Sequence, residues 1–132
     1  MTHQATVLVR CVDVRYSKDG TRQSLPEAYD FTYPGAALGL VNDPTWRANL
    51  FAQWEILTTL GITIGKIIIT DHYSAQGNHS GCKAYERDDS RERHERNLHV
   101  AAQLIQAQPR FRAIPVQLYL QDLDAGTLEE VK

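Results

Sequence analysis

The sequence predicts an α/β protein in which a mainly parallel sheet of about four strands is flanked by helices. Short apolar runs rich in β-branched residues alternate with longer segments of helical periodicity, and this alternation favours parallel pairing through right-handed crossovers. The runs lack a regular polar alternation, which is typical of strands buried on both faces. A chain of 132 residues suits one hydrophobic core, so we expect a single domain over residues 1–132.

The first strand is expected at residues 5–12, and a polar loop at 17–26 separates it from a second, short strand at 29–33. Pro34 and Gly35 then end this strand. Proline lacks the N–H group that a strand ladder needs, and glycine allows the backbone to turn tightly.

The first helix is expected to begin at Asp43 and Pro44, because aspartate is a favourable N-cap and proline is tolerated at the first helical position. Gly61 is placed to cap its carboxyl end. Between them runs an apolar stripe of helical spacing that predicts one buried face. The stripe consists of Leu50, Phe51, Trp54, Leu57 and Leu60.

A third strand is expected at residues 66–70, whose β-branched composition indicates a central position in the sheet. Residues 71–81 are polar and contain glycine, so we expect a loop there. Connections between a strand and a helix usually take about 2–6 residues. A loop of this length is therefore a candidate for function.

The second helix is expected from Glu86 up to Pro109, because opposite charges recur at i,i+4 spacing and an apolar stripe follows on one face. His94 and His99 fall within it, and we expect them in solvent or at the edge of the core. The remaining elements are a fourth strand at 113–120 and a short helix or strand at 126–132.

Composition excludes several classes of function. The net charge of -2, the pI near 6.2 and the absence of a basic stripe argue against nucleic acid as a partner. No apolar run approaches the ~20 residues that span a bilayer, and no basic leader precedes an apolar stretch at the N-terminus. We expect a cytoplasmic protein without a membrane partner, in which two cysteines serve metal binding or catalysis more often than a disulfide.

The two cysteines predict a zinc site, because Cys11 closely follows the apolar run of residues 5–9, where the first strand ends, and Cys82 lies downstream of the third strand. Ligand sites form at the carboxyl ends of parallel strands, and two thiolates with one imidazole suit tetrahedral zinc. Asp13 would then lie near the metal as an acid/base group, and Arg15 would orient it through a paired hydrogen bond. Taken singly, each cysteine is better explained as a small buried side chain, with Asp13 and Arg15 as an ordinary ion pair. Their combination favours zinc.

Two histidines compete for the third ligand position. His79 has the HxxC spacing to Cys82, which lets one short turn deliver both side chains to one metal, and we favour it. His72, the first histidine after the third strand, stays open as the alternative ligand.

The segment CVDVR at residues 11–15 resembles the CxDxR motif of the β-class carbonic anhydrases, and NHSGCKAY at 78–85 resembles their HxxCG segment. The resemblance extends over residues 5–128 and marks the chain as a short, divergent relative. It implies a zinc enzyme that hydrates CO₂ reversibly to bicarbonate by a zinc-bound hydroxide. It also implies that Asp13 hydrogen-bonds that hydroxide or occupies the metal, and that Arg15 draws Asp13 away.

The sequence departs from the family at Lys83, which stands where the family has glycine, and by about seven extra residues beside the histidine ligand. Two alternatives stay open. One is a hydrolase for COS or CS₂ on the same scaffold, because the same zinc hydroxide would attack these molecules. The other is a zinc-binding protein without turnover, which Lys83 and the long loop favour. We expect a homodimer or a higher homo-oligomer, because a small sheet leaves strand edges open and the helix face of Phe51 and Trp54 partly covered.

Overall fold

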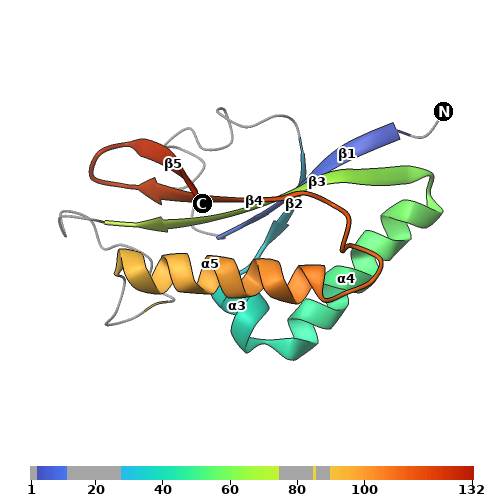
Figure 1. The fold of residues 1–132 in the computed structure, drawn as a ribbon, viewed down its shortest axis with the longest axis horizontal. Coiled ribbons are helices and arrows are strands. Elements are labelled where there is room, and N and C mark those ends of the chain that lie inside the picture. The colour runs from blue at the N-terminus through green and yellow to red at the C-terminus, as the bar shows by residue number, and fades with distance from the viewer. Residues whose placement is uncertain (1–2, 12–27, 75–84, 86–89) are drawn as a thin grey trace.

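The structure is a computed structural model that describes residues 3–11, 28–74, 85 and 90–132, and these form one five-stranded sheet with three helices on one of its faces (Figure 1). The strand order is β2-β1-β3-β4-β5, with the first four parallel and β5 antiparallel to β4. The predicted α/β class is confirmed, and the segment at 126–132, expected as a short helix or strand, contains the fifth strand. In chain order the elements are β1 (His3–Arg10), β2 (Tyr29–Thr32), α3 (Ala37–Asn42), α4 (Pro44–Thr59), β3 (Ile62–Tyr73), α5 (Arg91–Gln106), β4 (Val116–Asp122) and β5 (Thr127–Val131).

Strands β1 and β3 form the centre of the sheet, as their apolar composition predicts. Val7 pairs with Ile67 and Val9 with Ile69, and all four side chains are fully buried. Leu98 of α5 and Leu40 of α3 belong to the same core cluster as these residues. The helices therefore cover the face of the sheet toward which the odd-numbered residues of β1 point.

Strand β3 continues three residues beyond its predicted end, through Asp71, His72 and Tyr73. The expectation of a loop beginning at Asp71 was wrong, because β4 pairs with β3 as far as Tyr73 opposite Asp122 and so keeps the chain extended. Residues 75–81 of the predicted loop lie outside the described part of the chain.

Helix α4 follows the prediction closely, and the Asp43 carboxylate caps it by accepting a hydrogen bond from the Trp46 N–H at 2.9 Å. Trp54 is fully buried against the rings of Phe31, Phe51 and Phe111. The expectation of a partly covered face at Phe51 and Trp54 therefore holds for Phe51, which is partly buried, and is wrong for Trp54, which these rings cover within one chain. The large apolar side chains that α4 and its C-cap expose are Ile56 and Leu60.

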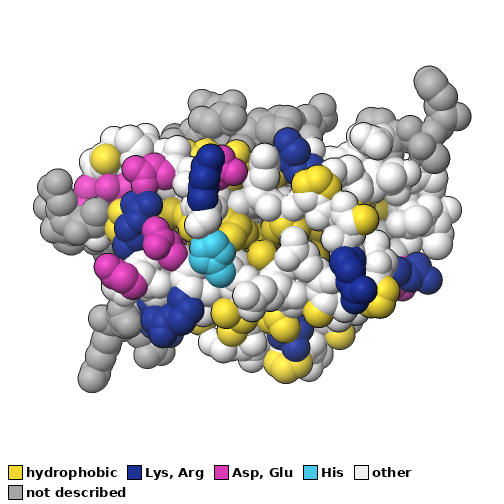
Figure 2. Space-filling view, in the orientation of Figure 1, with side chains coloured by type: hydrophobic (Ala, Val, Ile, Leu, Met, Phe, Trp, Pro, Cys, Tyr) yellow, Lys and Arg dark blue, Asp and Glu magenta, His cyan; other side chains and the backbone are white. Residues whose placement is uncertain are grey.

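Helix α5 begins at Arg91, with the Ser90 hydroxyl accepting a hydrogen bond from the Arg93 N–H at 3.3 Å. Charged side chains gather over the first half of α5 and over β5 (Figure 2), where Arg91 pairs with Glu95 and Glu129. The opposite face of α5 is buried. No described helix is long and apolar enough to cross a membrane.

The two histidines of α5 lie in different environments. His99 is exposed, as expected, but His94 is fully buried on the stripe that also carries Leu98 and Ile105. The expectation of a histidine in solvent or at the core edge was wrong for His94, because a buried carboxylate on β3 offers its imidazole a partner.

Candidate functional site

The strand order places a candidate site at the carboxyl ends of β1 and β3. Strand β2 lies on one side of β1 and β3 on the other, so the order reverses between them. In open α/β sheets, ligands bind outside the strand ends at such a reversal. Cys11 directly follows β1, and continuing the register of Val9 with Ile69 brings it level with Asp71, beside His72.

The Cys11 thiol is buried and receives a directed hydrogen bond. Its residue is 4% exposed, and the Gly35 N–H points at Sγ with a nitrogen–sulfur distance of 3.4 Å. The turn that presents this N–H has two consecutive positive φ angles, 85° at Gly35 and 47° at Ala36. A positive φ at alanine costs on the order of 1 kcal/mol, and such strain often marks functional sites. An N–H aimed at sulfur stabilises negative charge there, and the thiolate is the form that binds metal.

Asp71 is the centre of a buried hydrogen-bond network. Its Oδ2 accepts a hydrogen bond from the Tyr85 hydroxyl at 2.7 Å and lies 2.8 Å from Nδ1 of His94. Its Oδ1 accepts a third hydrogen bond, from the Ala37 N–H at 3.2 Å. Asp71, Tyr85 and His94 are each at most 1% exposed. An ionised carboxylate only accepts, so His94 Nδ1 carries the hydrogen in this arrangement.

Tyr85 is held on several sides. Its ring stacks on the His94 imidazole with centroids 3.8 Å apart, and the Arg93 guanidinium carbon lies 4.9 Å from the ring centre. Asn97 Nδ2 donates to the Tyr85 hydroxyl at 3.4 Å, and Arg93 Nη1 donates to the Tyr85 carbonyl at 2.8 Å. The side chain also packs against Cys11. The network around Asp71 therefore reaches the predicted metal ligand.

His72 is fully buried on the other face of the sheet. Successive side chains of a strand point to opposite faces, and Asp71 points to α5, so His72 points away from the helices. Its neighbour across the ladder to β4 is Gln121, which is 1% exposed.

The predicted site residues divide into two groups. Cys11 and His72 lie at the carboxyl edge of the sheet, where the zinc site was predicted. The other predicted residues lie outside the described part of the chain: Asp13, Arg15, His79, Cys82 and also Lys83. Within the described ranges, no three His, Cys, Asp or Glu side chains form a group that could hold a metal ion.

The sequence interpretation missed Asp71, Tyr85 and His94 as parts of the site. A signal for His94 exists, because it precedes Leu98 by four residues and Ile105 by eleven and so extends the apolar stripe of α5. A histidine on such a stripe indicates a buried imidazole that needs a hydrogen-bond partner. No comparable signal marks Tyr85, whose partners are distant in sequence.

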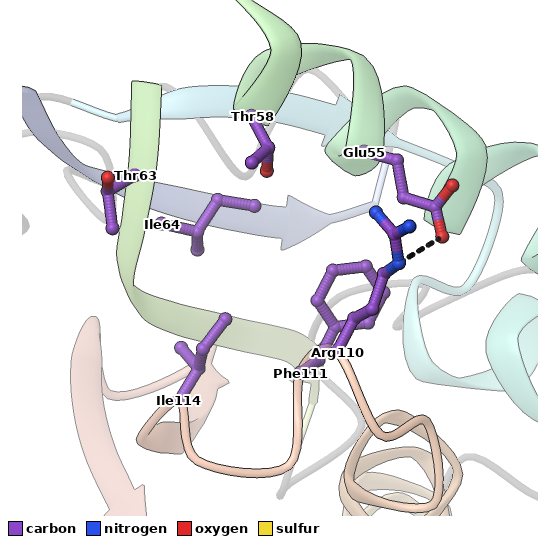
Figure 3. A pocket seen from close by; sticks show the side chains of 7 residues that line it. All are labelled: Glu55, Thr58, Thr63, Ile64, Arg110, Phe111 and Ile114. Carbon is purple, nitrogen blue, oxygen red and sulfur yellow. Dashed lines mark ion pairs between the residues drawn. The ribbon is translucent and has the colours of Figure 1, made fainter. Parts of the chain in front are cut away.

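A cavity of about 310 Å³ lies at the opposite, amino edge of the sheet (Figure 3). Ile64, Phe111 and Ile114 form its apolar lining, and the ion pair of Arg110 with Glu55 stands at one side with a nitrogen–oxygen distance of 3.5 Å. It contains none of the predicted site residues.

The fold matches solved β-carbonic anhydrase structures. The carbonic anhydrase of Streptococcus mutans has a TM-score of 0.58 at 18% sequence identity, covering 96% of this chain and 81% of that one. A chain from a study of two tetrameric β-carbonic anhydrases of Sordaria macrospora has a TM-score of 0.59 at 12% identity, covering 99% of this chain and 82% of that one. The β-carbonic anhydrase of Aspergillus fumigatus gives 0.59 at 15%, covering 99% and 76%.

Neither a protein-family model nor a curated protein matches the sequence. The structural likenesses, at identities of 12–18%, establish a β-carbonic-anhydrase-like fold. The resemblance read from the two sequence motifs is thereby confirmed for the fold.

Proposed function

We propose that the chain is a zinc-dependent lyase that interconverts CO₂ and bicarbonate. The observation that carries this proposal is the environment of Cys11, which stands at the switch point of a β-carbonic-anhydrase-like sheet and accepts the Gly35 N–H on its buried sulfur. Tyr85, three residues after Cys82 in the sequence, packs against Cys11, which supports a shared site for the two cysteines.

The donor set fits zinc, because a buried thiolate with a hydrogen-bonded sulfur is a favourable ligand for a borderline-soft ion. Cys11, Cys82 and His79 would hold the metal, with His72 as the alternative to His79. When bound, zinc would lower the pKa of a water from about 15.7 to about 7. Asp13 would accept a hydrogen bond from the reacting water, and Arg15 would hold the Asp13 carboxylate in the orientation that this needs.

The decisive experiment measures zinc content and stopped-flow CO₂ hydration on one preparation. We expect about one zinc per chain, and we expect Asp13→Asn and Arg15→Ala to keep the zinc while hydration falls about 100-fold or more. A wild-type rate in either variant would show that the pair is structural. Zinc without CO₂ turnover would favour COS or CS₂ as substrate if these are hydrolysed, and a non-catalytic zinc protein if they are not.

The proposal extends to a homodimer or a multiple of one. The structural neighbours from Sordaria macrospora are tetrameric, and Ile56 and Leu60 leave apolar side chains 56% and 69% exposed. Light scattering over a dilution series measures the mass, and an active monomer of 14.9 kDa would contradict this assignment.

A further inference from the structure

We propose that Asp71, Tyr85 and His94 form a clasp that positions the Cys11 thiolate for metal, so that Asp71 is a positioning residue of the site. The inference rests on the zinc site proposed above. It assigns a role to Asp71 and His94, which lie outside both motif segments, and to Tyr85, the last residue of the second segment.

Asp71 holds the turn that faces Cys11. Its Oδ1 accepts the Ala37 N–H, two residues after Gly35, whose own N–H points at the Cys11 sulfur. Asp71 therefore ties down the strained turn of Gly35 and Ala36, which presents the donor to the thiol. Without that tie, the positive φ of Ala36 has less to hold it in place.

Tyr85 connects Asp71 with Cys11. Its hydroxyl donates to Asp71 Oδ2 at 2.7 Å, while its side chain packs against Cys11. The hydrogen bond fixes where the ring stands, and the ring occupies space beside the sulfur. The Asp71 carboxylate therefore positions both the Gly35 N–H that points at the Cys11 sulfur and the Tyr85 ring that packs beside it.

His94 contacts both Asp71 and Tyr85 and so limits the movement of both side chains. Its Nδ1 lies 2.8 Å from Asp71 Oδ2, and its ring stacks on Tyr85 at 3.8 Å. Helix α5 carries this histidine on its buried face, so the clasp joins β3, α5 and the turn before α3. Hydrogen bonds to the surroundings of metal ligands change metal affinity about 10–100-fold.

The test is Tyr85→Phe, which keeps the ring and removes the hydroxyl that donates to Asp71. The matched control is Tyr29→Phe, which removes the hydroxyl of a tyrosine that is 39% exposed at the amino end of β2. Competition with a chelator measures zinc affinity, the spectrum of the cobalt-substituted protein reports ligand geometry, and thermal melts with chelator report stability. We expect zinc affinity to fall about 10-fold or more in Tyr85→Phe with shifted cobalt bands, and to stay unchanged in Tyr29→Phe.

A second pair of variants covers the case in which the tyrosine is tolerated poorly. His94→Gln keeps an N–H donor for Asp71 and His94→Leu removes it, so we expect the glutamine to retain more zinc affinity. Wild-type zinc affinity and cobalt bands in Tyr85→Phe would overturn the clasp and leave the zinc enzyme standing. If the wild-type protein binds neither zinc nor cobalt, both the clasp and the proposed zinc enzyme are overturned. If it binds zinc but does not hydrate CO₂, only the proposed reaction is overturned, and the zinc affinity of Tyr85→Phe still decides on the clasp.

Discussion

At the carboxyl edge of the sheet, Asp71 and His94 meet at 2.8 Å with exposures of 1% and 0%. At the amino edge, Arg110 and Glu55 meet at 3.5 Å with side chains that are 67% and 46% exposed. The first pair is enclosed by the core and satisfied by further donors, and the second stands beside a cavity in contact with solvent (Figure 3).

Among the described residues, the cavity beside Arg110 and the buried network of Asp71 therefore lie at opposite ends of the same strands. Burying a carboxylate is unfavourable unless hydrogen bonds replace its water, and the three donors to Asp71 come from separate parts of the chain. An exposed ion pair places no such demand on its surroundings, since solvent screens it. The buried network, and not the cavity of about 310 Å³, therefore indicates the site.

The largest expected effect is loss of metal from the carboxyl edge alone. Cys11→Ser should reduce zinc from about one to about a tenth of an equivalent per chain, because serine is a poor ligand for zinc. Thr63→Ala, at the cavity of the amino edge, should keep full zinc. Elemental analysis of both variants measures this, and full occupancy in Cys11→Ser would refute the zinc site.

Zinc content in variants of His72 and His79 shows which of these histidines binds the metal. His79→Ala should lose most of its zinc, whereas His72→Ala should keep it, because His72 points to the face opposite Asp71. The same elemental analysis decides between them. Normal zinc in His79→Ala together with loss in His72→Ala would reverse the assignment.

Loss of a carboxylate should lower the free energy of unfolding more at the carboxyl edge of the sheet than at the amino edge. Asp71→Ala leaves three buried donors without their acceptor and should lower the free energy of unfolding by about 3–5 kcal/mol. Glu55→Ala breaks an exposed pair and should cost about 0–1 kcal/mol. Urea titrations with a chelator present, so that metal binding adds nothing, provide both values. Equal losses would break the contrast between the edges.

The smallest effect concerns Asp43, a partly exposed carboxylate between α3 and α4. The Tyr33 hydroxyl donates to it and lowers the pKa of Asp43 below its usual value near 3.8. A depressed folded-state pKa contributes stability above the unfolded pKa, and this contribution is lost as pH falls through the folded value. Asp43→Asn should therefore lose less stability than wild type between pH 5 and about pH 2. Urea midpoints across that range test it, and parallel curves would contradict the assignment.

Local patterns predicted the elements whose signals lie within one segment. The capping aspartate and proline predicted the start of α4, and the β-branched run predicted the buried body of β3. The extension of β3 to Tyr73 was missed because it depends on β4, about fifty residues away. Helix α3 was missed because it begins after a turn with a positive φ at Ala36. Alanine rarely adopts a positive φ, so its presence in the sequence does not predict such a turn.

The sequence by itself determined the α/β class, the placement of Cys11 at a strand end and the motif resemblance that points to zinc, because these depend on composition and short spacings. Only the tertiary structure decided that Asp71 would be buried, since its donors come from Ala37, Tyr85 and His94. A polar side chain is read from sequence as exposed unless its partners are visible nearby. Here the partners lie 14 to 34 residues away, and the packing of α3 and α5 against β3 brings them together.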